Sequence, residues 1–203
     1  MAYYDYKKAY DYVHHDWLNR VIGWMELDIK VRKVISKMMS GWKTRLVITC
    51  EREQRKSRWI QFNQGFLQGD SFSPVGFCIC EIPILMLIES SKGYRMGPPG
   101  DKIVNKTHNL FLDDLKIYQE TEEQLEVVNK ILVQASGDTG ARYGVKKCCK
   151  AVFRQGKLTE TEGLTINEEL TQVLDPIEGN TYKFLGLEQS AGVSRENVLK
   201  RIE

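Results

Sequence analysis

The chain lacks the cysteine and histidine patterns of a disulfide-bonded or zinc-binding protein. Its 5 cysteines are Cys50, Cys78, Cys80, Cys148 and Cys149, and its 3 histidines are His14, His15 and His108. The cysteine count is odd, and the neighbours Cys148 and Cys149 lack the two-residue gap that zinc knuckles use. These absences favour free thiols in a reduced, intracellular compartment.

The chain also has little net charge and no uninterrupted hydrophobic run. A formal net charge of +2 is too small to indicate nucleic-acid binding by itself. The apolar stretch from Val75 to Ile88 is short and contains Glu81 and Pro83, so we expect no membrane span. We also expect no signal peptide. With 203 residues, 42% of them hydrophobic, the composition is that of a globular protein, and we expect one domain over residues 1–203.

Two adjacent carboxylates are the most informative feature that is present. Asp113 and Asp114 lie within the apolar stretch from Leu110 to Tyr118, which predicts a strand pair with the carboxylates at its tip. Ionised carboxylates among apolar neighbours are costly to desolvate and repel each other, so we expect a cation there. Mg²⁺ and Mn²⁺ suit such oxygen-rich sites. An ordinary hairpin turn, in which Asp is common, is the alternative.

Another carboxylate, Asp5, has a similar setting near the start of the chain. The aromatic residues around it predict a strand that delivers Asp5 at its end. If that strand lies beside the strand pair of Asp113, the carboxylates converge on two metal ions about 3.5–4 Å apart, as two-metal phosphoryl transfer requires. Asp11 is instead expected to cap a helix that runs from about His15 to Met25.

A glycine-bearing loop over residues 63–74 leads into the apolar stretch. We expect a buried helix there, capped by Ser71 or Ser73 and with Pro74 in its first turn. Glycines let the backbone approach a flat ligand such as a base pair, and helix N-terminal amides favour phosphate. An ordinary loop-to-helix junction is the alternative.

Basic residues cluster between two tryptophans, Trp42 and Trp59. They are Lys43, Arg45, Arg52, Arg55, Lys56 and Arg58. A basic strip with aromatic residues is suited to track a phosphate backbone and to stack on bases. The alternative is a solvated hairpin with one tryptophan side buried.

The remaining segments predict an α+β fold. Helices are expected twice between about His15 and Gly41 and once near Glu122–Ser136, from apolar residues at helical spacing. Strands are expected as a hairpin over Thr44–Cys50 and Ser57–Phe62, and near Ala151–Arg154 and Tyr182–Glu188. Residues 93–106 are expected to form a loop, because the sequence Gly97-Pro98-Pro99-Gly100 excludes regular structure.

Five segments of the chain, in this order, resemble motifs A to E of the reverse transcriptases of non-LTR (LINE-like) retrotransposons. They are Asp5–Asp11 for motif A, Gln68–Pro74 for motif B, Phe111–Asp114 for motif C, Gly144–Cys148 for motif D and Tyr182–Gly186 for motif E, the primer grip. The resemblance spans nearly the whole chain. It implies a polymerase palm, an antiparallel sheet backed by helices.

The resemblance also implies which residues bind metal. Asp5 and Asp113 would hold two Mg²⁺ or Mn²⁺ ions, and Asp114 would assist. The backbone carbonyl of Tyr6 would be a further ligand. The sequence departs from the family at Tyr4, where an aliphatic residue is usual, but every one of these metal-binding groups is present.

Nucleotide contacts follow from the resemblance in the same way. Tyr10 matches the aromatic steric gate that leaves no room for a 2′-hydroxyl, with a plain core tyrosine as the alternative. Gln68 and Gly69 match residues that contact the incoming nucleotide and the template base. Lys147 matches a lysine proposed to protonate the pyrophosphate leaving group. The alternative is a solvated lysine, because Lys146, Lys147 and Lys150 are close together in the sequence.

The implied activity is that of an RNA-directed DNA polymerase. It would join a deoxynucleoside triphosphate to a DNA primer 3′-hydroxyl on an RNA template. The chain resembles only the palm, without the fingers segment and the thumb, so we expect it to be part of a longer retrotransposon protein and inactive alone. A non-catalytic remnant, or an adopted nucleic-acid-binding protein, is the alternative.

Overall fold

The structure, a computed structural model, describes residues 1–50, 53–97, 103–177 and 180–189. The chain separates into two compact units. Unit 1 comprises Met1–Ala9 and Ile82–Glu203, and unit 2 comprises Tyr10–Glu81. Unit 1 contains a sheet and a long helix that packs on one of its faces, whereas unit 2 contains helices and hairpins.

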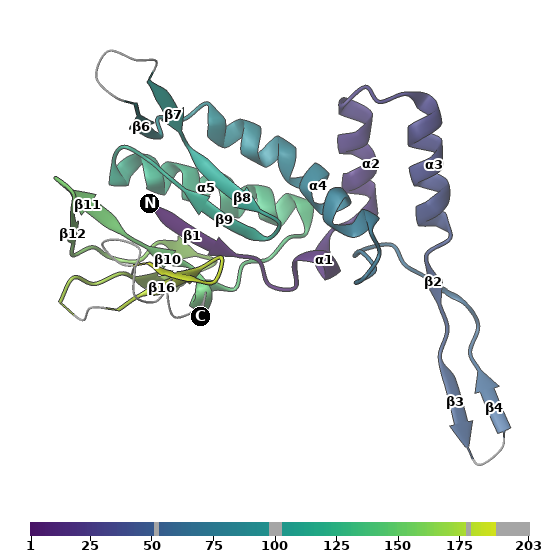
Figure 1. The fold of residues 1–203 in the computed structure, drawn as a ribbon. Helices are drawn as coiled ribbons and strands as arrows, with labels where there is room; N and C mark the ends of the chain where they lie inside the picture. The colour runs from purple at the N-terminus through teal and green to yellow at the C-terminus, as the bar shows by residue number, and fades with distance from the viewer. Residues whose placement is uncertain (51–52, 98–102, 178–179, 190–203) are drawn as a thin grey trace, which may run out of the picture. The chain divides into compact units, whose positions relative to one another are not determined.

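A five-stranded sheet forms the centre of unit 1 (Figure 1). In the order β15-β10-β1-β9-β8, its strands are β15 (Gln172–Val173), β10 (Cys149–Lys150), β1 (Ala2–Asp5), β9 (Asp114–Ile117) and β8 (His108–Phe111). Neighbouring strands run antiparallel except β10 and β15, which are parallel. The predicted α+β fold with a palm-like sheet is therefore confirmed, with a parallel pairing added at one edge.

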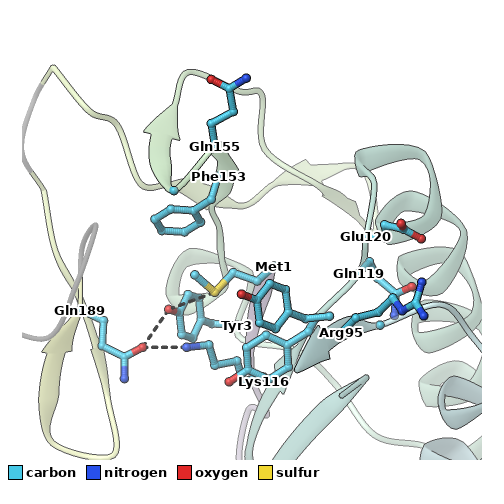
Figure 2. Close-up of a pocket in the computed structure, with 13 residues that line it drawn as sticks. Met1, Tyr3, Arg95, Lys116, Gln119, Glu120, Phe153, Gln155 and Gln189 are labelled. Atoms are coloured by element: carbon cyan, nitrogen blue, oxygen red, sulfur yellow. Dashed lines mark hydrogen bonds between the residues drawn. The ribbon is translucent and has the colours of Figure 1, made fainter. Parts of the chain in front are cut away.

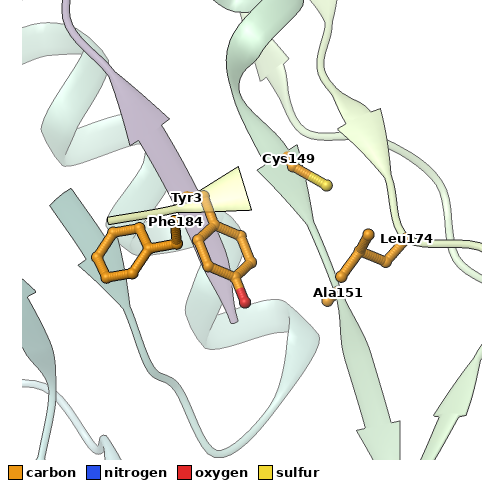
Figure 3. Close-up of a cluster of buried hydrophobic side chains, with 5 residues drawn as sticks. All are labelled: Tyr3, Cys149, Ala151, Leu174 and Phe184. Carbon is orange, nitrogen blue, oxygen red and sulfur yellow. The ribbon is translucent and has the colours of Figure 1, made fainter. Parts of the chain in front are cut away.

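The side chains of β1 alternate between the two faces of this sheet, because strand side chains have a period of two. Tyr4 pairs with Leu115, and its hydroxyl donates to Asn129 Oδ1 in helix α5 (Glu122–Thr139) at 3.0 Å. Helix α5 therefore packs on this face. Tyr3 points to the opposite face and belongs to a buried cluster with Cys149, Ala151, Leu174 and Phe184 (Figure 3).

Helix α5 confirms the helix predicted near Glu122–Ser136 and continues to Thr139. The Thr121 side chain accepts a hydrogen bond from the Gln124 backbone N–H, and Gly140 ends the helix with a left-handed φ of 83°. Both are ordinary capping devices. The buried apolar residues of its inner face are Leu125, Val128 and Leu132. Helical spacing was sufficient to predict this face because it packs on a single sheet.

Four hairpins and a short 3-10 helix complete unit 1. The hairpins pair β6 (Tyr94–Met96) with β7 (Val104–Lys106), β11 (Val152–Arg154) with β12 (Lys157–Thr159), β13 (Thr165–Ile166) with β14 (Glu169–Leu170), and β16 (Tyr182–Phe184) with β17 (Leu187–Gln189). The 3-10 helix is η1 (Val145–Lys147). The strand predicted near Ala151–Arg154 is confirmed as β11.

Two predictions about these hairpins were wrong. Residues 93–106 do not form only a loop, because β6 and β7 pair within them; the predicted turn residues Pro98, Pro99 and Gly100 lie outside the described residues. The strand predicted over Tyr182–Glu188 is two strands, joined by a turn in which Leu185 and Gly186 have positive φ. Local composition predicts which segments are extended, but it does not predict which strand pairs with which.

Unit 2 contains helices α1 (Ala9–Tyr12), α2 (His15–Trp24) and α3 (Ile29–Ser40). The boundary between the units follows Ala9, the first residue of α1. Its strands are β2 (Lys43–Thr44), β3 (Val47–Cys50), β4 (Glu53–Lys56) and β5 (Ile60–Gln61). The two predicted helices and the hairpin are confirmed. The returning strand begins earlier than predicted, because β4 pairs with β3 and β5 with β2.

Asp11 does not cap α2, so that prediction was wrong. Asp11 lies inside α1, and the N-cap position of α2 is His14, whose side chain makes no capping hydrogen bond. Asp11 is part of the short helix α1, so it does not lie at the start of α2. A helix of four residues is too short to produce a recognisable periodicity in the sequence.

The predicted apolar helix is α4 (Phe72–Glu89), with Pro74 in its first turn. Ser73 is not its cap, because the Ser73 hydroxyl donates to the Leu67 carbonyl at 2.7 Å; Asp70 Oδ1 instead accepts from the Phe72 N–H at 2.8 Å. Contrary to expectation, α4 is long and apolar enough to cross a membrane, with 18 residues and mean hydropathy 1.7. Core helices of soluble proteins pass the same test, so this is weak evidence for a membrane.

Candidate active site

Strand pairing brings the predicted carboxylates to one end of the unit 1 sheet. Asp5 ends β1 and is the register partner of Asp114, which begins β9. Asp113 lies in the turn between β8 and β9, where Leu112 adopts a positive φ of 54°. The predicted position of the Asp5 strand beside the strand pair of Asp113 is therefore confirmed, and it follows from the antiparallel pairing of β1 with β9.

The pKa values of Asp5 and Asp114 are raised mainly by burial, and repulsion between the carboxylates adds to the effect. Burial raises the pKa of Asp5 above its ordinary value, and the charge of Asp113 raises it further, whereas Lys147 lowers it. Burial likewise raises the pKa of Asp114, and the charges of Asp113 and Asp5 add to the effect. A cation between them would remove this cost, because it favours the ionised forms.

Lys147 forms an ion pair with one member of this group. Its Nζ lies 3.5 Å from Asp5 Oδ2, and its side chain is 73% exposed. An exposed ion pair of this length contributes about 0–1 kcal/mol, so a stronger cation can displace it. Lys150, in contrast, is buried and pairs with Glu122 Oε2 at 3.1 Å, away from the carboxylates. Of the neighbouring lysines predicted from the sequence, the structure therefore pairs Lys147 with Asp5.

Two further neighbours fix the position of Asp5. The backbone N–H of Gly144 donates to the Asp5 carbonyl at 2.8 Å, and a Cβ at Gly144 would lie 2.8 Å from Asp5 Oδ2. The thiol of Cys148 accepts from the Asp5 N–H at 3.5 Å. Burial raises the pKa of Cys148 to about 11, so this thiol stays protonated at neutral pH and serves packing.

Tyr6, the residue after Asp5, is held at a fixed position by the main chain. It forms an isolated bridge with Tyr143, and the two rings stack with centroids 5.0 Å apart. Flanking hydrogen bonds run from Lys7 N to Arg142 O and from Gly144 N to Asp5 O, both 2.8 Å long. Its backbone therefore has little freedom next to the carboxylates.

The donor set fits a small, hard divalent cation but does not form a complete protein cage. Within residues 1–50, 53–97, 103–177 and 180–189, no group of three or more His, Cys, Asp and Glu side chains could hold a metal ion by itself. Mg²⁺ commonly uses one or two carboxylates and takes its other ligands from water and substrate phosphates. The raised pKa values of Asp5 and Asp114 support such an open site.

The predicted nucleotide-contacting residues outside this group belong to unit 2. Tyr10 is half-buried in α1, with its ring edge-on to Phe66 and Phe77 at centroid distances of 6.4 and 5.6 Å. Gln68 and Gly69 are exposed in the loop before α4. Gly69 has φ of 89°, and a Cβ there would meet nothing within 4 Å, so the conformation rather than crowding favours glycine.

The basic strip also lies in unit 2, on an exposed hairpin. Trp59 is 54% exposed and has Lys43 and Arg45 over its ring, at 5.2 and 4.6 Å from the centroid, whereas Trp42 is buried. The predicted member Arg52 lies outside the described residues. The hairpin thus presents cations around a ring face, which is suited to phosphate and base contacts.

Sequence patterns did not reveal how Tyr182 relates to the carboxylates. Its ring stacks on Tyr3, with centroids 4.3 Å apart, on the sheet face that also bears Asp5. Burial raises the pKa of Tyr182, with smaller contributions from several negative groups that include Asp5 and Asp114. The β16–β17 hairpin therefore lies beside the candidate site. Because side chains alternate along a strand, the sequence of β1 is sufficient to predict that Tyr3 and Asp5 lie on the same face. The position of the β16–β17 hairpin against that face depends on tertiary packing.

A helix-backed sheet that presents carboxylates at the end of adjacent antiparallel strands is the architecture of a polymerase palm. The profile of the family described as "Reverse transcriptase (RNA-dependent DNA polymerase)" matches residues 1–189, and the chain belongs to that family. It is 29% identical over 194 residues to the "Retrovirus-related Pol polyprotein from type-1 retrotransposable element R2" of Nasonia vitripennis. The predicted resemblance to non-LTR retrotransposon proteins is thereby confirmed.

The two aligned proteins differ greatly in length. The alignment covers 92% of this chain but 18% of the relative, so the chain spans less than a fifth of the curated protein it matches.

Proposed function

We propose that this chain forms the catalytic palm of an RNA-directed DNA polymerase. The reaction is attack of a primer 3′-hydroxyl on the α-phosphate of a deoxynucleoside triphosphate, with release of pyrophosphate. The observation that carries the proposal is the pairing of Asp5 with Asp114 beside Asp113, three carboxylates at the end of adjacent strands. Their electrostatic cost in the absence of a cation is what a metal-dependent site predicts.

In this proposal each acidic residue has a stated role. Asp5 and Asp113 hold two Mg²⁺ or Mn²⁺ ions, Asp114 assists, and the backbone carbonyl of Tyr6 is a further ligand. When bound, the ions lower the pKa of the attacking hydroxyl and neutralise charge on the phosphate oxygens. The protein orients the reacting groups through the fixed ends of β1 and β9, and positioning supplies much of the rate.

Lys147 is proposed as the proton donor to the pyrophosphate leaving group. Its ammonium lies 3.5 Å from Asp5 Oδ2 on a mostly exposed side chain, so it is close to the carboxylates yet free to swing. Exposure also allows its proton to be replaced from water after each turnover.

The bound partners in this proposal are nucleic acids and the incoming nucleotide. Gln68 and Gly69 contact the nucleotide and the template base, and Tyr10 tests the sugar. The template is RNA and the primer DNA. We further propose that the chain acts within a longer retrotransposon protein in the reduced interior of the cell, which agrees with its 5 unpaired cysteines.

Titration of the chain with Mn²⁺ by calorimetry tests the metal site without requiring activity. We expect the wild type to bind Mn²⁺ and the Asp5→Asn/Asp113→Asn variant to lose that binding, because the ligands' charges are removed. The matched control is Asp16→Asn/Asp138→Asn, which removes two exposed carboxylates from helices and should retain binding. Primer extension on an RNA template, by the polypeptide that contains this chain, then tests the reaction.

The opposite result has a clear meaning. A folded wild-type chain that binds no Mn²⁺ would refute the catalytic proposal. The exposed cation-rich hairpin around Trp59 would then favour a non-catalytic nucleic-acid-binding protein.

The steric-gate role of Tyr10 gives a separate prediction. Tyr10→Ala should raise ribonucleotide incorporation relative to deoxyribonucleotide incorporation by about tenfold or more, because a ring that excludes the 2′-hydroxyl is removed. Tyr10→Phe keeps the ring that packs against Phe66 and Phe77 and is the control. Competition between the two nucleotide types in primer extension measures the ratio. Equal discrimination by Tyr10→Ala and the wild type would remove Tyr10 from this role.

A further inference from the structure

Lys116 and His15 are buried polar side chains that the proposed reaction does not use. Lys116 lines a cavity of about 700 Å³ in unit 1, and its Nζ donates to Gln189 Oε1 at 2.8 Å (Figure 2). That hydrogen bond joins β9 to β17, so packing of the β16–β17 hairpin accounts for it. His15 lies in unit 2, and its side chain instead binds the loop that leads to Gln68 and Gly69.

His15 begins α2, and its side chain is held on two sides. The residue is 8% exposed, and its Nε2 lies 2.7 Å from the Gly65 carbonyl oxygen. A carbonyl oxygen only accepts, so Nε2 carries the proton and donates the hydrogen bond. The imidazole ring also lies edge-on to the buried ring of Trp42, with centroids 5.3 Å apart. His15 therefore anchors the loop at Gly65.

The anchored loop is bonded to the segment that contains Tyr10. The backbone N–H of Gly65 donates to the Val13 carbonyl at 2.7 Å, and that of Phe66 donates to the Tyr10 carbonyl at 2.8 Å. Gly65 has φ of 80°, and a Cβ there would lie 3.0 Å from the Asp11 carbonyl oxygen. The loop and α1 are thus in direct backbone contact, so a shift of one moves the other.

Phe66 transmits the position of this loop to the ring of Tyr10. Phe66 is 5% exposed, and its ring lies edge-on to the Tyr10 ring, with centroids 6.4 Å apart. It also packs against the rings of Trp42 and Phe72, at centroid distances of 6.0 and 6.3 Å. On the side of α4, a Cβ at Gly76 would lie 2.7 Å from Phe66 Cε1. Because the ring is enclosed by these neighbours, a displacement of the loop displaces Tyr10 as well.

We propose that His15 is a positioning residue for sugar discrimination. Its N–H anchors Gly65, and the segment of Gly65 and Phe66 in turn fixes the ring of Tyr10. The inference rests on the proposed function, in which Tyr10 tests the sugar. A ring that excludes a single hydroxyl must be held to within about 1 Å, so the anchor matters more for discrimination than for the rate of correct incorporation.

Primer extension on an RNA template, by the polypeptide that contains this chain, tests this role with two variants. His15→Leu removes the donor and retains bulk, whereas His15→Gln keeps an N–H donor on a side chain of similar reach. We expect His15→Leu to raise ribonucleotide incorporation about fivefold and to leave deoxyribonucleotide incorporation within about twofold, because the ring of Tyr10 stays but moves. His15→Gln should restore most of the discrimination. His14→Leu changes the neighbouring, exposed histidine and should behave as the wild type.

Gly76→Ala tests the Phe66 step separately and carries the test if His15→Leu does not fold. The new Cβ displaces the Phe66 ring, whereas the His15 hydrogen bond stays and alanine favours the helix. Ribonucleotide incorporation should again rise about fivefold. Gly137→Ala is the control, because a Cβ there meets nothing within 4 Å.

Amide hydrogen exchange of the full chain tests the anchor without any activity. The Phe66 amide should exchange about tenfold faster in His15→Leu than in the wild type or His15→Gln, because the loop opens more often. A wild-type polypeptide that extends no primer would refute the proposed function, and the exchange result would still decide the anchor. The inference is overturned if a folded His15→Leu or Gly76→Ala discriminates as the wild type, if His15→Gln is as permissive as His15→Leu, or if Phe66 exchange is unchanged in His15→Leu.

Discussion

Asp113→Asn is expected to reduce primer extension by about a thousandfold or more while leaving the metal-free fold at least as stable as the wild type. A thousandfold loss corresponds to about 4 kcal/mol of transition-state stabilisation, which is the scale of a metal ligand's contribution. The fold should survive because Asp113 lies in a turn and its side chain is exposed. Mn²⁺ affinity of the chain should fall in parallel, which calorimetry measures without an activity assay.

The stability effect of this variant should depend on pH in a defined direction. Asp113 raises the pKa values of Asp5 and Asp114, so the folded chain holds these carboxylates at a cost once they ionise. That cost is present at neutral pH and disappears below the unfolded pKa, near about 4. The gain in free energy of unfolding from Asp113→Asn should therefore appear at pH 7 and vanish near pH 4. Because both carboxyls are partly solvated, it should not exceed about 1 kcal/mol.

Thermal unfolding at the two pH values, with and without Mn²⁺, measures this effect. Asp138→Asn, at an exposed position of α5, is the matched control and should change neither the pH dependence nor the response to Mn²⁺. A metal-free Asp113→Asn variant that is strongly destabilised at pH 7 would show that Asp113 has a structural role instead.

Gly144→Ala is expected to slow primer extension by about 10–100-fold through a single added methyl group. The new Cβ would lie 2.8 Å from Asp5 Oδ2, closer than carbon and oxygen can approach, so the carboxylate must move. Displacement of a catalytic group by about 1 Å can cost about a hundredfold in rate. The backbone of Gly144, with φ of −83°, is accessible to alanine, so the fold should change little.

Three measurements separate displacement of Asp5 from general damage. Mn²⁺ affinity and primer extension should both fall, whereas the free energy of unfolding should change by less than about 1 kcal/mol. Gly137→Ala in α5 is the control, because a Cβ there meets nothing within 4 Å and alanine favours helices. Unchanged Mn²⁺ affinity in Gly144→Ala would mean that Asp5 can move without loss of the site.

Elements with a strong local pattern were predictable from the sequence. Helix α5 has apolar residues at helical spacing, a Thr cap and a terminating Gly, and each signal acts within a few residues. The ends of β1 and β9 were predictable in the same way, because polar carboxylates interrupt apolar stretches. Asp11 was misjudged as a cap, and of the two serines predicted to cap α4 the structure excludes Ser73. Capping depends on where the helix begins, and that boundary shifts by a residue or two with tertiary context.

The sequence by itself determined which chemical groups this protein has and which element carries each. Asp5 lies at a strand end, and Asp113 and Asp114 lie at a hairpin tip. Lys147 follows Gly144 in motif D. Only the tertiary structure decided which of these groups meet. Pairing of β1 with β9 set Asp5 against Asp114, and the return of the chain to β10 brought Gly144 and Lys147 to Asp5. The same packing enclosed Lys116 and Gln119 in one cavity. Contacts between residues distant in the chain depend on strand register and packing, and no local pattern encodes them.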